Sequence, residues 1–354
     1  MEINYLYSAS VGIKTDDISI LCDPWFTQGI FYGSWFHYPY IPEEISRIGK
    51  FDYIYISHLH EDHCDIRFLK KYISNYPEVK IIIADRERNF LSKILKASNI
   101  DHQCIKSMSY IDTQIDILTD KSRGNSSIDS LLIVKYKDQI YINANDCLID
   151  KVMAKEINSK KQDNIEYKIV LSIGYAGAND WPHMYTSYNE KERLEVINKK
   201  IDINLMKFKK GVELISPNII HPFAGQYILG GSLYKVNEKR GIPDALEAKK
   251  LFRNAIVLEE YIGIIDIKKM KCYNERQDEY SKSEMNNYIN ELKTKEFDYK
   301  YNSDNIDINR FKESIDRAYN KYSNNNCLKL EFYTKNIEDD NAKVEKIIEF
   351  NFNS

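Results

Sequence analysis

The sequence contains the segment Ser57-His58-Leu59-His60-Glu61-Asp62-His63, directly after the apolar, aromatic-rich run Phe51–Ile56. The run has the length and composition of a buried strand, so the polar segment begins where that strand ends. Three imidazoles and a carboxylate this close together are the nitrogen and oxygen ligands that a divalent cation binds. We therefore interpret the segment as a metal site rather than as a solvated histidine cluster on a surface loop.

The spacing within this segment predicts two metal ions. Side chains alternate along an extended chain, so His58 and His60 project to one side and can bind one ion together. Asp62 and His63 follow where the chain turns into the next helix, and can reach a second ion. Two ions about 3.5–4 Å apart share a water molecule, lower its pKa toward neutrality and hold an oxyanion.

Composition excludes several classes of partner. The chain of 354 residues has a formal net charge of -3 and no concentrated basic stripe, which argues against binding nucleic acid. It has no run of 18 or more apolar residues and no signal-peptide pattern, and its six cysteines are scattered without C-x-x-C pairs. We expect a cytoplasmic protein with a small-molecule substrate and no nucleic-acid or membrane partner, and leave its oligomeric state open.

The rest of the chain alternates between short apolar runs and amphipathic segments, which predicts an α/β architecture with helices covering sheets. Expected strands cover 3–7, 18–22, 79–84, 115–118, 130–136, 139–143 and 168–173, and expected helices cover 43–50, 66–76, 89–98 and 190–207. Beyond about residue 231 the pattern loosens, with helices expected at 244–258 and 281–295 and strands at 328–333 and 346–352. We predict a first domain over 1–230 and a carboxyl-terminal α+β extension over 231–354, which could pack on the same domain.

Four further residues stand at strand ends, where the polar groups of an α/β protein gather. Asp146 ends a predicted strand, a position from which a carboxylate can bridge two cations, and Asp129 begins the preceding strand and could approach the same site. Asp23 precedes a proline at another strand end, where it either orients a ligating histidine or starts a turn. His221 ends a later apolar run.

Together these residues resemble the metallo-β-lactamase superfamily, whose hallmark is H-x-H-x-D-H after a strand, then a strand-end Asp and a late His. The matching residues are His58, His60, Asp62, His63, Asp146 and His221. Local sequence is most similar to the metallo-β-lactamase-type domain of CMP-N-acetylneuraminate hydroxylases and related bacterial metallo-hydrolases in the segments 22–25, 56–60, 145–147 and 222–225. The resemblance covers about residues 1–230 and implies an αββα sandwich with the metals at one edge of the two sheets.

One ligand of the superfamily pattern is missing. Members usually have another His between the main motif and the strand-end Asp, but the only His in that interval is His102, in a polar loop and far too early. Asp129 is the favoured replacement, and His102 is the alternative. An oxygen ligand there shifts the preference from zinc toward iron or manganese. We expect two divalent metal ions, zinc or iron, with manganese as a further option.

Two enzymatic functions fit this reading. The first is a dinuclear hydrolase that acts on a small-molecule or sugar-nucleotide-like substrate through a metal-bound hydroxide, with Asp62 or Asp146 orienting the nucleophile and passing a proton. The alternative is a di-iron oxygenase. Because the chain lacks the Cys-x-His pairs of a Rieske cluster, its electrons would come from a separate electron-donor protein, from the substrate or from another reductant. A purely structural site is disfavoured, since four ligands normally close such a site and six or seven groups are offered here.

Two loops are candidates for the substrate pocket. The small residues from Gly174 permit a tight loop that runs to Trp181 and His183, and this loop resembles a Trp-Pro-containing segment of the hydroxylase-like group. We predict that Trp181 offers a stacking face and His183 a hydrogen bond or a proton; in the alternative, Trp181 packs in the core and His183 caps a turn. The aromatic loop 29–42 is expected to wall the mouth of the site, with His37 as a packing residue.

Overall fold

The computed structural model describes residues 1–41, 45–122, 124, 127–179, 181–185, 187–295, 313, 327–334 and 343–351. The chain divides into two compact units, Met1–Asp298 and Tyr299–Ser354. The second unit contains an antiparallel hairpin of β17 (Cys327–Thr334) and β18 (Lys343–Asn351), which confirms the two strands predicted there.

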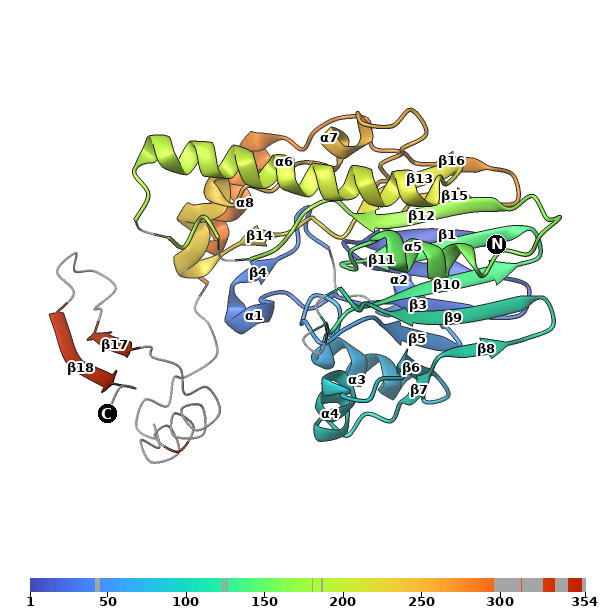
Figure 1. Ribbon diagram of the computed structural model, residues 1–354, viewed down its shortest axis with the longest axis horizontal. Helices are drawn as coiled ribbons and strands as arrows, with labels where there is room; N and C mark the ends of the chain where they lie inside the picture. The colour runs from blue at the N-terminus through green and yellow to red at the C-terminus, as the bar shows by residue number, and fades with distance from the viewer. Residues whose placement is uncertain are drawn as a thin grey trace. The chain divides into compact units, whose positions relative to one another are not determined.

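Two sheets form the body of this unit (Figure 1). In spatial order the described strands of the first sheet are β16 (Lys271–Tyr273), β15 (Ile264–Asp266), β1 (Glu2–Tyr7), β2 (Ser10–Lys14), β3 (Ser19–Cys22), β5 (Tyr53–Ile56), β6 (Lys80–Ala84) and β7 (Gln103–Ile105). Those of the second sheet are β13 (Ile219–Phe223), β12 (Lys168–Gly174), β11 (Gln139–Asn145), β10 (Ser130–Tyr136), β9 (Thr113–Thr119) and β8 (Ser107–Ser109). In each sheet parallel and antiparallel pairs are mixed.

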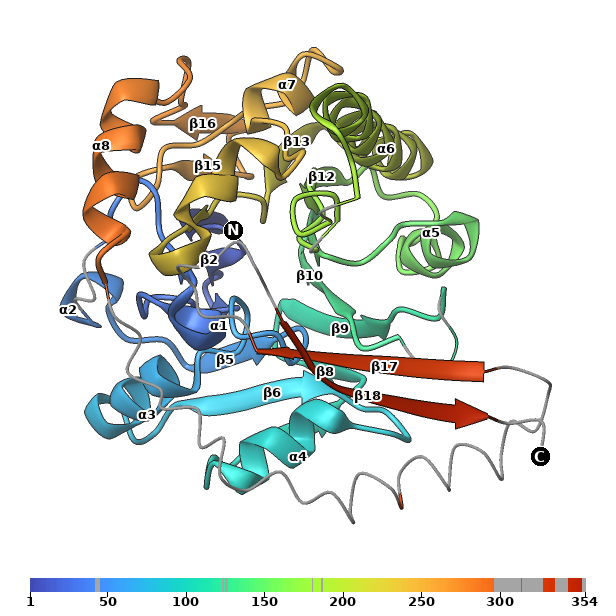
Figure 2. The same ribbon diagram turned by 90° about the vertical axis from the view of Figure 1, so that its left-hand side faces the viewer.

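Helices cover the outer face of each sheet (Figure 2). The first sheet packs against α3 (Ile66–Asn75) and α4 (Phe90–Ala97), and the second against α5 (Lys151–Asn158) and α6 (Glu190–Ile215). This four-layer αββα sandwich is the class that the sequence predicted. The smaller elements are α1 (Ile30–Gly33), β4 (Trp35–Phe36), α2 (Ile45–Ile48), β14 (Ile228–Leu229), the 3-10 helix η2 (Gly231–Lys239), α7 (Ala245–Lys249) and α8 (Lys282–Leu292).

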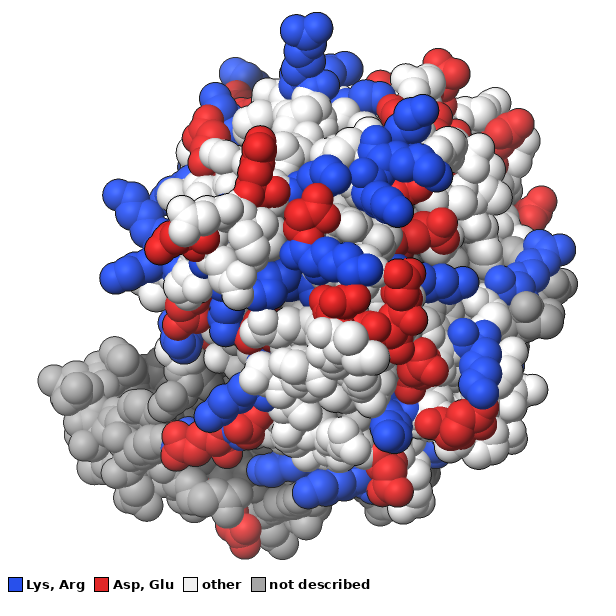
Figure 3. All heavy atoms as spheres, turned by 90° about the vertical axis from the view of Figure 1, so that its right-hand side faces the viewer, with Lys and Arg blue, Asp and Glu red and all other residues white. Residues whose placement is uncertain are grey.

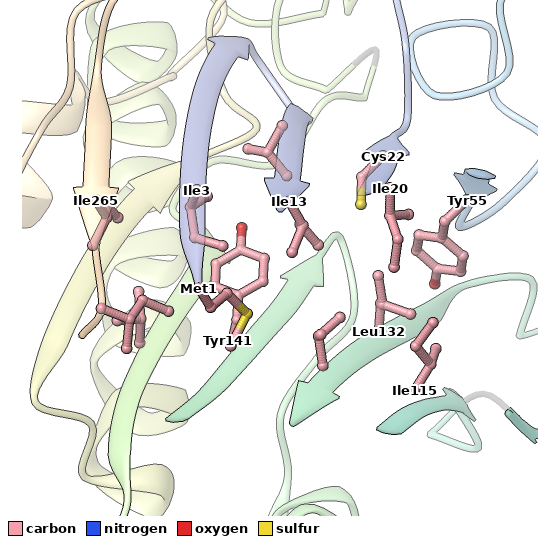
Figure 4. Close-up of a cluster of buried hydrophobic side chains, with 14 of the residues drawn as sticks. Met1, Ile3, Ile13, Ile20, Cys22, Tyr55, Ile115, Leu132, Tyr141 and Ile265 are labelled. Atoms are coloured by element: carbon pink, nitrogen blue, oxygen red, sulfur yellow. The ribbon is translucent and has the colours of Figure 1, made fainter. Parts of the chain in front are cut away.

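The central core lies between the two sheets (Figure 4). Alternate residues of the first sheet, among them Ile3, Ile13 and Ile20, point toward Leu132 and Tyr141 of the second, and all five are buried. Burying one such aliphatic side chain contributes about 1.5–3 kcal/mol. The two sheets therefore bury this core between their own side chains.

Several described elements, among them β2, α6 and α7, differ from the sequence prediction. Strand β2, which fills the space between β1 and β3, was not predicted. Helix α6 continues past residue 207 to Ile215, because Phe208, Val212 and Ile215 keep helical spacing and are buried against the second sheet. The helix predicted over 244–258 is confined to α7, and Ala255 instead forms an isolated bridge with Ile220.

Residues beyond 230 contribute to the same sandwich. Strand β15 pairs antiparallel with β1, with Ile265 opposite Ile3, and β16 pairs with β15. The first compact unit accordingly continues to Asp298. The domain boundary at residue 230 stays a prediction.

The surface carries both signs of charge. On the face shown in Figure 3, lysines and arginines alternate with aspartates and glutamates over the described residues, and neither sign forms a continuous field. Within the described residues, none of the helices combines the length and apolarity needed to cross a membrane.

Candidate metal centre

The predicted ligands come from strand ends that meet at one edge of the two sheets. Strands β3 and β5 are parallel, so Asp23 and the segment 57–63 leave the first sheet at the same edge. In the second sheet, β10 and β11 are antiparallel, which places Asp129, before β10, beside Asp146, after β11. The Ser130 hydroxyl joins the sheets by donating to the Ser57 carbonyl at 2.6 Å.

Six of the seven predicted ligands lie close together. The Nε2 atom of His58 is 2.8 Å from Nδ1 of His60, 3.7 Å from Asp129 Oδ1 and 3.9 Å from Asp146 Oδ2. The Nε2 atom of His63 is 3.5 Å from Asp62 Oδ2 and 3.7 Å from Asp146 Oδ2. Ligand atoms bonded to one ion at 2.0–2.2 Å are separated by about 3–4 Å, so the four spacings between a histidine nitrogen and a carboxylate oxygen suit bound metal. The donor atoms of His58, His63 and Asp146 are all within 4.8 Å of one another.

The hydrogen bonds behind the histidines fix which nitrogen faces this cluster. Asp23 is fully buried and accepts from the Ser57 backbone N–H and hydroxyl, both at 2.7 Å, and from His63 Nδ1 at 2.9 Å. Because the Ser57 hydroxyl donates to Asp23, its oxygen can accept from His58 Nδ1, 3.0 Å away. These contacts place a proton on Nδ1 of both rings and turn Nε2 toward the cluster, where a bound cation would take its lone pair, as in metal-binding histidines. Asp23 therefore orients a candidate ligand, one of the two roles considered from the sequence.

The electrostatics of the cluster favour a bound cation. Desolvation raises the pKa of Asp146 to about 7, with Asp62 and Asp129 adding to the rise and His63 opposing it. For His63, burial lowers the pKa, but the carboxylates of Asp62, Asp146 and Asp23 outweigh burial and raise the pKa to about 10. A cation between the carboxylates removes their mutual repulsion. The donor set, its spacing and its charge thus fit a divalent metal, while the role of each residue as a ligand stays a prediction.

The seventh predicted ligand, His221, has different surroundings. It lies on β13 with the same alternation as Ile219 and Phe223, which face the core between the sheets. Its Nδ1 is 3.0 Å from the Ser172 hydroxyl, its ring meets the edge of Tyr5 at 4.9 Å, and burial lowers its pKa to about 3. In the described structure these contacts are with the sheets rather than with the donor cluster.

The two alternatives for the missing ligand have different surroundings in the structure. His102 contacts the Ser92 hydroxyl at 2.8 Å and the Ile100 carbonyl at 3.0 Å, so it ties α4 to the following loop. Asp129 lies in the cluster, and its backbone carbonyl accepts a hydrogen bond from Arg86. Sequence reasoning missed Arg86, although a polar residue just after β6 was a usable signal.

The loop with Trp181 and His183 is held by α6. Lys200 Nζ donates to the Trp181 carbonyl at 2.7 Å, and Arg193 donates to the Pro182 carbonyl at 3.2 Å. These contacts place the loop over the first half of the helix. The catalytic role of His183 and the stacking role of Trp181 remain predictions.

A cavity of about 460 Å³ adjoins the cluster, with His60 and Glu61 in its wall. Its other wall comes from Phe31 and Tyr32, so the aromatic loop does border the site as the sequence predicted. The Phe31 backbone N–H donates to Glu61 Oε2 at 2.7 Å, which ties the loop to the segment of candidate ligands. His37 is buried against the rings of Tyr7 and Trp25, in the packing role predicted for it.

An αββα sandwich with a His/Asp cluster at one edge of its sheets defines a protein of the metallo-β-lactamase type. The chain belongs to the beta-lactamase superfamily, whose domain model matches residues 2–223. Members of this superfamily are mostly enzymes, and the resemblance inferred from the sequence is confirmed.

Curated relatives share part of their length with this chain. The chain is 24% identical over 238 residues to the cytidine monophosphate-N-acetylneuraminic acid hydroxylase of Gorilla gorilla gorilla, covering 64% of this chain and 38% of the relative. It is 24% identical over 271 residues to the Xenopus laevis enzyme of that name, covering 72% and 43%. The chain thus spans about two fifths of these relatives. Among solved structures, an isothiocyanate hydrolase from Delia radicum gut bacteria superposes with a TM-score of 0.48 at 11% identity, covering 75% of this chain and 98% of that one.

Proposed function

We propose that this protein is a dinuclear metal-dependent hydrolase acting on a small-molecule substrate. The observation that carries the proposal is the cluster of six donor groups, in which Asp23 and Ser57 direct the Nε2 atoms of His58 and His63 toward carboxylates. Six donors exceed the number that closes a structural site. Two four-coordinate ions have about eight positions in all, so six donors would leave some of them for water and substrate.

The exposure of the side chains suggests different roles for the histidines and the aspartates. His58 and His63 are buried and held by hydrogen bonds, so they fix the position of the centre. The side chains of Asp62 and Asp146 are 13% and 36% exposed, so they can exchange protons with water. When bound, divalent ions supply Lewis acidity and lower the pKa of water. Asp62 or Asp146 then takes a proton from the attacking water and returns one to the leaving group.

The cavity beside His60 would receive the part of the substrate next to the scissile bond. Phe31 and Tyr32 give it aromatic walls, while Glu61 and Arg67 provide charged groups at its border. Aromatic walls with a few polar groups are typical of small-molecule sites.

A second candidate is a di-iron oxygenase served by a separate electron-donor protein. Asp62, Asp129 and Asp146 contribute as many oxygen donors to the cluster as its histidines contribute nitrogens, and oxygen donors favour iron or manganese over zinc. The named relatives are hydroxylases, which also supports this candidate.

Metal loading and oxygen dependence distinguish the two candidates. The protein would be loaded with Zn²⁺, Mn²⁺ or Fe²⁺ and assayed with chromogenic esters and a chromogenic phosphodiester, in air and under nitrogen. The hydrolase proposal expects two ions per chain and equal turnover with and without oxygen. Turnover and metal content should be lost in His58→Ala and retained in His102→Ala. If the iron-loaded protein consumes oxygen and shows no turnover under nitrogen, the hydrolase proposal is rejected and the oxygenase proposal is supported.

A further inference from the structure

Arg240 is a buried cation with an unused hydrogen-bond donor. Its side chain is 9% exposed, and its Nε donates to the Asn237 carbonyl at 3.2 Å. Among the described residues its Nη1 has no hydrogen-bond partner, and no carboxylate lies within 4.0 Å of the guanidinium. Buried guanidinium groups in native proteins are normally paired, because an unpaired charged donor is costly.

The backbone and two aromatic rings hold Arg240 in place. Gly241 follows it with φ +65°, and a Cβ atom there would lie 3.1 Å from the Ile197 carbonyl of α6, so only glycine lets the chain pass this close to the helix. The guanidinium carbon is 4.3 Å from the centre of the Tyr227 ring. Trp35 stacks on Tyr227 at 3.5 Å and 5°, so it occupies the opposite face of that ring. The cation is therefore preorganised rather than mobile.

Arg240 lines a cavity of about 500 Å³ between η2, α6 and α8. Volumes of 300–1,000 Å³ are typical of sites for small molecules. Isoleucines and Met285 give apolar surface, and Gln226, Asn237 and Asn286 add amide groups. The cavity thus offers one fixed positive charge in a partly apolar wall.

The acidic residues of this cavity leave that charge available. Asp244 is already paired with Arg276 at 2.8 Å, and the Glu247 side chain accepts from the Asp244 backbone N–H. Glu238 and Glu279 are exposed, where solvent screens them. Among the described residues, no ion pair neutralises the Arg240 guanidinium, since Asp244 pairs with Arg276 instead.

The cavity is a neighbour of the metal cluster. Aromatic contacts lead from His60 to Phe31 at 6.4 Å, from Phe31 to Trp35 at 4.7 Å, and from Trp35 to Tyr227. Burial raises the pKa of the Tyr227 phenol, Arg240 opposes this shift, and the Asp62 carboxylate adds to it, so Asp62 lies within electrostatic reach. The rings of Phe31, Trp35 and Tyr227 therefore connect the Arg240 cavity with the segment that contains His60.

We propose that Arg240 is an oxyanion-binding residue, which holds a phosphate or carboxylate group of the small-molecule substrate in the cavity next to the metal cluster. The proposal rests on the hydrolase function for the identity of the ligand as substrate, but not for the binding itself. Guanidinium groups bind both oxyanions through paired N–H donors. The substrate class is accordingly an anionic small molecule.

The test measures binding of inorganic phosphate to the full chain by ³¹P line broadening, with the protein metal-loaded and again after chelation. Wild type should bind saturably in both states, and Arg240→Met should weaken binding by about ten-fold or more. Lys282→Met is the matched control, because Lys282 lines the same cavity but is exposed, and it should change the affinity far less. Displacement by acetate distinguishes a carboxylate site from one selective for phosphate.

Each other outcome has a definite meaning. Wild type without saturable binding, or equal binding by Arg240→Met, overturns the proposal. Binding that disappears on chelation assigns phosphate to the metal cluster and overturns the Arg240 site, while the hydrolase proposal stands. If phosphate binding depends on Arg240 but the protein has no hydrolytic activity, only the hydrolase proposal is rejected. If Arg240→Met melts early, Arg240→Gln supplies the neutral comparison.

Discussion

Replacing Asp23 by Asn changes one atom in the wall of the metal centre and should alter the protonation of a candidate ligand. The Asp23 carboxylate only accepts, and it receives His63 Nδ1–H at 2.9 Å and two donors of Ser57 at 2.7 Å. An Asn side chain keeps one oxygen for the Ser57 backbone N–H. Its amide NH₂ then points at His63 Nδ1, which must become an acceptor, and the proton moves to Nε2.

The contacts of Asp23 allow the expected changes in metal affinity and in the free energy of unfolding to be estimated. A proton on Nε2 removes the lone pair of His63 from the cluster, and loss of such an outer hydrogen bond lowers metal affinity by about 10–100-fold, or roughly 1.4–2.8 kcal/mol. The free energy of unfolding of the metal-free protein should fall by about 1.5–3 kcal/mol, because a buried hydrogen bond to a charged group is lost. Chelator competition measures the affinity, and urea denaturation measures the stability.

Asp65→Asn is the matched control for this variant. Asp65 is also buried and also accepts three hydrogen bonds, from the backbone N–H groups of Phe26, Thr27 and Phe68 at 3.2, 2.8 and 3.0 Å. It should lose comparable stability and keep wild-type metal affinity. If Asp23→Asn binds metal as tightly as wild type, or if both variants lose affinity equally, the tautomer argument is refuted.

Three other perturbations test separate parts of the structure. Asp129→Ala should lower metal content by elemental analysis while His102→Ala leaves it unchanged; the reverse pattern would assign the missing ligand to His102. Gly174→Ala would place a Cβ 2.9 Å from the Asn145 carbonyl, so urea denaturation should show a loss of about 1–3 kcal/mol together with weaker metal binding, and wild-type behaviour would contradict the contact. Burial lowers the pKa of His37 to about 3, so below pH 6.5 the unfolded state binds a proton that the folded state does not. The free energy of unfolding therefore decreases as the pH is lowered. His37→Phe should reduce the slope of unfolding free energy against pH between pH 5.5 and 4.5 by up to about 1.4 kcal/mol per unit, and an unchanged slope would exclude this source.

The cluster was predictable because its residues lie close together in the sequence or at the ends of neighbouring strands. His58, His60 and His63 lie within one short segment after a strand, so their spacing alone brought them together. Asp129 and Asp146 flank a hairpin, and antiparallel pairing places the start of one strand beside the end of the next. Six donors were therefore gathered by strand order, without knowledge of side-chain packing.

Two kinds of feature could not be predicted from the sequence: the side of a sheet that a residue faces, and contacts between residues far apart in the chain. A histidine after an apolar run can face either side of a sheet, and only the register of β13 between its neighbours turns His221 toward Ser172 and Tyr5. Strand β2 contains Gly12, which lowers strand propensity. A Cβ atom there would lie 2.8 Å from the Phe51 ring, so close packing against Phe51 requires glycine at this position. The Arg240 site likewise joins Trp35, Tyr227 and α6 from three distant parts of the chain.

The pairing of β1 with β15 has a consequence for biosynthesis. One edge of β1 pairs with β2 within the first 14 residues, but the other edge receives Ile264–Asp266 only after about 260 residues have been made. At 5–20 residues per second, this edge stays unpaired on the ribosome for roughly 13–50 s. An exposed strand edge is a template for aggregation, so nascent chains that stall before residue 264 should be the species that chaperones hold.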